Sequence, residues 1–358
     1  MAEHKKIRFH LPGLSFNYPI NMLLVDLMKA KPEFFREGVS IGSFFGEFPT
    51  SLWNGGRFSR GVQCPEEMVK SVVKNINNLG IPVRYTFTNP IIFEEDLSDR
   101  YCNFCMKVGD NGMNEVLVVS PVLEKYIREK YPSYKCSSST CKEIKDIDRL
   151  NDELRKGYDL VVLDQNMNRD FDFISRIEDK GRIELLVNPC CGPNCGRRAE
   201  HYRLISAQQR LVFANREIRA GRKPAEVLEK LPDYVKRVLP EDIKNGKLPA
   251  DASGCPVIPY PEWECSFGEY NTPYSIRGNL NYISPDEIWE KYVPMGFSNF
   301  KLEGRTGNLF SIVEDYVNYM CTVEARDEAR YTLLTQLNGQ GLIRVNRIWW
   351  MKPRQGQK

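Results

Sequence analysis

The feature that most constrains the fold is a regular succession of short apolar segments, each followed by a stretch with helical periodicity. Residues 159–164 read DLVVLD and residues 115–120 read EVLVVS, so valine and leucine fill most of their positions. Short, nearly continuous apolar runs are typical of strands buried on both faces of a parallel sheet. Eight such strands are predicted, at residues 7–10, 39–45, 83–88, 115–120, 135–139, 159–164, 183–188 and 299–303.

Helical segments separate most of these strands, which is the arrangement that closes into a (β/α)8 barrel. A doubly wound open sheet is the alternative, but no Gly-x-Gly-x-x-Gly motif follows the first strand, which weighs against dinucleotide binding. We therefore predict an α/β protein in which residues 1–330 form one TIM-barrel-like domain and residues 331–358 a C-terminal extension.

A long excursion separates the seventh strand from the eighth. Residues 190–284 are too many for an ordinary connection in a barrel, so a function is expected for them. They contain two predicted helices, 208–220 and 225–239, and then a segment rich in proline and glycine at 248–275. Charges of both signs in residues 210–247 mark this part as an expected docking element for a protein partner.

Polar residues follow nearly every predicted strand, at the end where barrel enzymes place their chemistry. Each of these residues is also an ordinary choice for a turn or a helix cap, so a purely structural role stays open for each one. Taken together they favour a polar pocket, and they are His10, Asn89, Ser120, Thr140, Asp164, Asn166, Asn188 and Cys190.

The eighth strand carries a more specific pattern. Alternation places Phe300 and Leu302 on the face toward the helices, so Lys301, Glu303 and Arg305 point into the barrel. Buried charges must pair with one another or with a ligand. The pattern fits either a structural ion network or an anchor for a carboxylate or phosphate group. Asp164 and Glu303 are the candidates for proton transfer.

Eleven cysteines stand out in this chain, which begins without an apolar leader and has no run of 18 apolar residues. We therefore expect a cytoplasmic protein that does not enter the membrane, with reduced thiols available to a metal. Cys190, Cys191 and Cys195 follow the seventh strand around a Gly-Pro turn, and Cys265 lies in the returning segment. Thiolates so placed can hold an iron–sulfur cluster, with zinc as the alternative. Cys102 and Cys105 form a C-x-x-C pair that is either packed or redox-active.

Several motifs resemble the collagenase-like peptidase family, peptidase family U32, between about residues 40 and 320. The most specific is Phe300-Lys-Leu-Glu-Gly-Arg305, close to the Lys-Ile-Glu-Gly-Arg motif of that family; the cysteine loop after strand seven is next. Weaker matches are Gly56-Arg57, the segment 117–120 and the segment 137–140. The resemblance implies a barrel-type α/β fold. It also implies a four-iron four-sulfur cluster, because members that hydroxylate ubiquinone or RNA without oxygen hold one on four cysteines.

Carried onto this chain, the resemblance implies cluster ligands at Cys190 or Cys191, at Cys195 and at Cys265. The function expected from it is an oxygen-independent hydroxylation, or a related redox modification, of a small molecule or an RNA. The formal net charge of +3 neither indicates nor excludes binding to RNA. Two alternatives stay open: a peptidase or hydrolase, although no His-Glu-x-x-His motif is present, and a non-catalytic cluster- or zinc-binding subunit of a modification complex.

Overall fold

Eight parallel strands close a barrel in sequence order in the computed structural model, which describes residues 6–55, 63–245, 247, 258, 269–304 and 308–344. Each strand pairs with the next, and β8 returns to pair with β1, where Phe9 lies opposite Phe300. The prediction of a TIM-barrel-like α/β fold is confirmed. The strands are β1 Ile7–Pro12, β2 Val39–Gly46, β3 Val83–Phe87, β4 Glu115–Val118, β5 Lys135–Ser138, β6 Leu160–Val162, β7 Ile183–Leu186 and β8 Asn299–Lys301.

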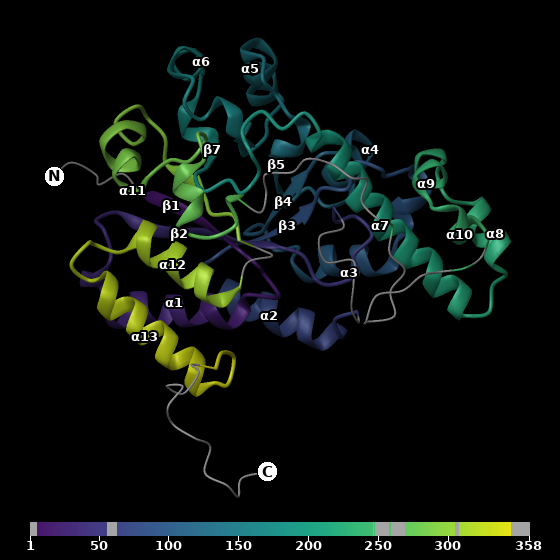
Figure 1. Ribbon diagram of the computed structural model, residues 1–358, viewed down its shortest axis with the longest axis horizontal. Helices are drawn as coiled ribbons and strands as arrows, with labels where there is room; N and C mark the ends of the chain where they lie inside the picture. The colour runs from purple at the N-terminus through teal and green to yellow at the C-terminus, as the bar shows by residue number, and fades with distance from the viewer. Residues whose placement is uncertain are drawn as a thin grey trace, which may run out of the picture.

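Helices surround this barrel, and a separate group of helices extends from one side of it (Figure 1). The turn into α4 is typical of how they begin: Pro121 starts the helix and the Ser120 side chain caps it by accepting a hydrogen bond from the Leu123 N–H. The barrel helices are α1 Tyr18–Ala30, α2 Glu66–Asn78, α3 Arg100–Val108, α4 Pro121–Lys130, α5 Ile147–Arg155, α6 Phe171–Ser175, α11 Pro285–Glu287, α12 Leu309–Met320 and α13 Arg326–Gly339.

The excursion after β7 folds differently from the two helices predicted for it. A single 22-residue helix, α7 (Arg198–Arg219), begins ten residues before the predicted start. The second predicted helix, 225–239, divides into α8 (Pro224–Glu229) and α9 (Asp233–Val238), and α10 (Glu241–Lys244) follows it. The division follows from Pro232 and Pro240, which stand at the N-caps of α9 and α10 and cannot continue a helix.

These helices share a small apolar core of their own, built from residues such as Leu211, Val235 and Ile243. The group is anchored to the barrel by polar side chains of α7. Gln209 donates to the Ser51 carbonyl at 2.7 Å, and Arg210 donates to the Ile91 carbonyl at 2.6 Å. The excursion therefore sits against the loops that follow β2 and β3.

The two faces of the strands differ in polarity. Outward-facing residues such as Phe9, Val116 and Phe300 pack with the helices in one continuous apolar core. The inward face instead holds buried charged or polar side chains on five strands, from His10, Arg84, Glu115, Glu184 and Lys301. As predicted for β8, Lys301 points into the barrel, while Phe300 and Leu302 lie in the apolar core; Glu303 follows the end of the strand.

Arg84 is the centre of the buried network. Its Nε donates to a Glu115 oxygen at 2.5 Å, another of its nitrogens binds Glu184, and a third lies 3.0 Å from His10 Nδ1. Lys301 Nζ reaches the other Glu184 oxygen at 3.4 Å. Burial opposes the ionisation of Glu184, but the charges of Arg84 and Lys301 hold its pKa well below the ordinary value.

His10 contributes no charge to this network. Burial, together with the positive charge of Arg84, lowers the pKa of His10 to about 3, so the ring is neutral at physiological pH. It binds Ser43 Oγ at 2.8 Å. The sequence grouped His10 with the strand-end residues of a pocket, but its place inside the network, within β1, gives it a structural role.

We expect Arg84→Met to lower the free energy of unfolding by about 3–5 kcal/mol, because it leaves Glu115 and Glu184 buried without their cation. Arg155→Met is the matched control, since Arg155 pairs with Asp152 and Glu178 at the surface and such pairs contribute about 1 kcal/mol or less. Urea denaturation followed by circular dichroism measures both. A loss below about 1 kcal/mol for Arg84→Met would show that the network is dispensable.

Candidate functional site

The carboxyl ends of the strands bring several sequence-predicted residues to one mouth of the barrel. Asp164 follows β6, the loop with Cys190, Cys191 and Cys195 follows β7, and Glu303 follows β8. Lys301 lies one layer deeper, between Glu184 and the Phe45 ring. The predicted site residues Arg305 and Cys265 lie outside the described residues, as do Cys255 and the Gly56-Arg57 segment.

Side-chain amides fix the cysteine loop in place. Asn279 donates to the carbonyls of Pro189 and Cys191 at 2.9 and 3.0 Å, and Gln165 donates to the Cys191 carbonyl at 3.3 Å. The Asn166 side chain accepts from the Asn194 N–H at 2.9 Å. Contacts from both sides of the loop therefore preorganise the backbone that carries the thiols.

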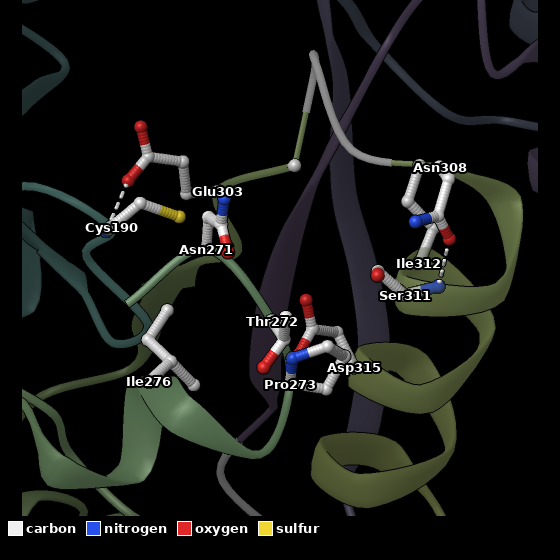
Figure 2. A pocket seen from close by; sticks show the side chains of 11 residues that line it. Cys190, Asn271, Thr272, Pro273, Ile276, Glu303, Asn308, Ser311, Ile312 and Asp315 are labelled. Atoms are coloured by element: carbon white, nitrogen blue, oxygen red, sulfur yellow. Dashed lines mark hydrogen bonds between the residues drawn. The ribbon is translucent and has the colours of Figure 1, made fainter. Parts of the chain in front are cut away.

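Cys191 and Cys195 form a pair within this loop. Burial and the neighbouring Cys195 raise the pKa of the Cys191 thiol to about 12, although the charge of Arg198 acts to lower it. The sulfur of Cys190 instead faces a separate pocket (Figure 2). Within the ranges that the structure describes, no three histidine, cysteine or acidic side chains gather to hold a metal ion.

Asp164 is paired with Arg198, and the sequence did not indicate that Arg198 is buried. Arg198, at the start of α7, is 3% exposed; it binds the Asp164 carboxylate and lies 3.5 Å from Glu143 Oε2. The Arg198–Asp164 salt bridge is therefore buried. The charge of Arg198 reaches both Asp164 and Cys191, so it links the acidic and thiol parts of the mouth.

Three loops at this mouth contain non-glycine residues in the left-handed region. They are Thr50 after β2, Glu143 after β5 and Asn194 in the cysteine loop, with φ of 70°, 48° and 53°. Asparagine tolerates this conformation, whereas a β-branched threonine adopts it at a cost of order 1–3 kcal/mol. Such strained positions cluster at functional sites, which agrees with a site at this end of the barrel.

Other predicted polar residues have structural roles. Asn89 donates to the Leu52 carbonyl and accepts from the Ile91 N–H, so it shapes a loop. Cys102 and Cys105 are buried in α3, and the Cys102 sulfur lies 3.1 Å from Ser51 Oγ. Burial raises the pKa of both thiols, so packing rather than redox chemistry accounts for this pair.

A pocket of about 280 Å³ opens beside the cysteine loop (Figure 2). Its described walls come from the turn at Cys190, from the returning segment at 271–276, from Glu303 and Gly304, and from the start of α12. The sequence did not indicate the wall at 271–276 or the one at α12. The pocket residues at α12 are its N-cap Asn308 and then Ser311, Ile312 and Asp315, at the spacing that places side chains on one helix face.

Asn188 joins the two acidic residues of this pocket. Its side chain accepts from the Glu303 N–H at 2.6 Å and donates to the Asp315 carboxyl at 3.1 Å. The Glu303 carboxylate in turn accepts from the Cys190 N–H at 2.8 Å. One amide at the end of β7 therefore sets the positions of the cysteine loop, the end of β8 and α12.

Asp315 is held in an unfavourable environment for a carboxylate. Burial raises its pKa to about 8, and the negative charges of Glu314 and Glu303 also raise it, while the hydrogen bond from Asn188 and the charge of Arg277 lower it. A buried carboxyl with a strongly raised pKa beside a pocket is characteristic of functional sites.

The comparisons with known proteins found a likeness among solved structures but not among sequences. No family model and no curated protein matches the sequence. Among solved structures, the U32 peptidase Mk0906 aligns over 85% of this chain and 95% of that one, with a TM-score of 0.43 and 11% sequence identity. Among the described residues, no helix has the length and apolar character needed to cross a membrane.

We expect Asp315→Asn to stabilise the protein increasingly as the pH rises from 4 to 8. Over this interval the unfolded state, with an aspartate pKa near 3.8, loses a proton that the folded state keeps up to about 8, so ionisation favours unfolding. The asparagine removes this penalty and keeps an oxygen for Asn188. Urea titrations should show no difference at pH 4 and a gain of about 1–3 kcal/mol at pH 8; an equal effect at both pH values would contradict the assignment.

Proposed function

We propose that the protein is an enzyme that binds an iron–sulfur cluster through thiolates at the mouth of its barrel and uses it in an oxygen-independent hydroxylation or a related redox modification. The observation that carries the proposal is the Cys191–Cys195 pair on the loop after β7, at the end of the barrel where such folds place their chemistry. A small molecule or an RNA is the proposed substrate.

The electrostatics of the pair support a metal. Burial and the neighbouring Cys195 raise the pKa of the Cys191 thiol, and a bound metal cation would stabilise its thiolate. Arg198 contributes in the same sense, because its charge favours the Cys191 thiolate. Cys191 and Cys195 are thus suited to be two ligands. A cubane cluster needs four, for which Cys190 and Cys265 remain the predicted contributors.

The peptidase alternative has less support from the geometry. A thiol with a raised pKa is a poor nucleophile, which disfavours Cys191 as an attacking group. His10 cannot act as its base, because it is buried between Ser43 and Arg84 inside the barrel. Zinc is the alternative metal for the same thiols, and a non-catalytic subunit that docks through residues 210–247 remains a prediction.

We expect protein purified without oxygen to contain iron and acid-labile sulfide in equal amounts, and Cys191→Ser and Cys195→Ser each to lose most of both. Cys321→Ser is the control, because Cys321 follows α12 and pairs with Phe35 ahead of β2, at the other end of the barrel. Elemental analysis and electronic absorption spectra measure the outcome. Zinc in place of iron would contradict the cluster, and metal content unchanged in both loop variants would contradict the thiolate site.

A further inference from the structure

The helical unit that follows the cysteine loop holds an excess of positive charge. Residues 197–247 contain thirteen lysines and arginines against seven aspartates and glutamates, a net charge of +6, whereas the formal net charge of the whole chain is +3. The rest of the chain is therefore net negative. The unit consists of α7 to α10, has its own apolar core and extends from one side of the barrel (Figure 1). Such charge asymmetry within a chain is typical of proteins that bind nucleic acid.

Two of these cations attach the unit to the barrel. Arg198 is buried against Asp164, and Arg210 is buried against Asp96. The other eleven cations share the unit with only seven acidic residues, so its surface keeps a surplus of four positive charges. This surplus is the part of the charge that an anionic partner can neutralise.

Arg203 on α7 and Arg237 on α9 contribute to this surplus. Both are exposed, and within the described part of the chain neither makes an ion pair. They belong to one surface, because the charges of both, together with that of Glu200, act on the hydroxyl of Tyr234. Glu200 is itself paired with Arg197 at 3.6 Å. The Arg237 guanidinium lies 6.0 Å from the centre of the Tyr234 ring, so an aromatic ring accompanies the two cations.

The cations of α7 are spread along its whole length rather than gathered at one point. A helix of 22 residues is about 33 Å long. The Arg197 side chain is 61% exposed just before it, and the Arg222 side chain is 58% exposed just after it. A compact metabolite contacts only a part of such a surface, whereas a phosphate backbone can follow it.

The kind of cation also favours a nucleic acid. Arginine binds phosphate with two parallel hydrogen bonds and stacks on flat rings, which lysine does not do. Arg216 already lies over the Phe213 ring, 5.1 Å from its centre. Unpaired bases stack on aromatic rings and on guanidinium groups, so such pairs are suited to a single strand.

We propose that this unit binds single-stranded RNA through its phosphate backbone, with Arg203 and Arg237 as phosphate contacts. Because α7 begins directly after the cysteine loop, a strand bound along it leads toward the mouth of the barrel. As the choice of RNA over a small molecule as substrate, this inference rests on the proposed function; as a binding surface, it does not depend on a metal. A protein partner was predicted for residues 210–247, and an acidic protein is the alternative that the test separates.

The test measures the fluorescence anisotropy of a labelled oligouridine of about 20 nucleotides with the full chain, purified without oxygen, at 50 and 200 mM KCl. We expect four phosphate contacts to weaken binding about fiftyfold between these salt concentrations, because each contact contributes about 0.7 to the slope of log K against log salt. A labelled polyglutamate of the same length should bind at least about tenfold more weakly than the RNA, because it offers no bases or phosphates.

Arg203→Gln/Arg237→Gln removes two of these contacts. It should weaken RNA binding at least about tenfold at the lower salt concentration and reduce the effect of salt to about sevenfold. Lys29→Gln/Lys135→Gln is the matched control, an equal change of charge on exposed lysines at the end of the barrel opposite the mouth, and should leave binding unchanged. Arg203→Lys/Arg237→Lys keeps both charges, so it should retain binding to within about threefold.

The inference is overturned if the RNA does not bind, if polyglutamate binds as tightly, or if the glutamine variant binds like the wild type. Loss of binding in the lysine variant as well would give the two arginines a structural role and would also overturn it. Iron and sulfide are measured on the same preparation. RNA binding without iron contradicts only the proposed function, and iron without RNA binding contradicts only this inference.

Discussion

The ion pairs of Arg84 with Glu115 and Glu184 are the interaction on which the rest of the structure depends. They connect β3 with β4 and, across the barrel, with β7, and none of the three side chains has more than slight contact with solvent. A barrel core is usually filled by branched apolar side chains. Here charged side chains occupy much of the barrel interior below the mouth. The closed barrel therefore depends on the pairing of these charges, because the loss of any one partner leaves the other as an unpaired buried charge.

This arrangement determines which groups remain for function. Glu184 engages both Arg84 and Lys301, and Arg84 approaches His10, so the charged residues low in the barrel satisfy one another. The residues one layer higher are held by neutral amides instead. Asn188 positions Glu303 and Asp315, and Asn279 holds the backbone of the cysteine loop. The Cys191 thiol and the Asp315 carboxyl, each with a raised pKa, therefore lie at this end of the barrel.

Patterns among residues close together in the sequence were sufficient to predict the strands of the barrel and the cysteine loop. The apolar runs identified all eight strands, and alternation along β8 placed Phe300 outside and Lys301 inside, because both depend on neighbours in sequence. The cysteine loop was found because three thiols and a Gly-Pro turn lie within seven residues.

Other features depend on contacts between distant segments, which no local spacing encodes. They are the pairing of Asp164 with Arg198, the wall at 271–276 and the burial of Asp315. One signal was available: the spacing of Asn308, Ser311 and Asp315 marks a polar stripe on an otherwise apolar helix.

We propose that the thiols of the β7 loop hold an iron–sulfur cluster at the mouth of the barrel. The Mössbauer spectrum of protein produced with ⁵⁷Fe and purified without oxygen, compared with that of Cys195→Ser, tests this proposal directly. We expect the spectrum of a thiolate-bound four-iron cluster, lost or altered in the variant. A spectrum without cluster iron, or one that is identical in the two proteins, would contradict it.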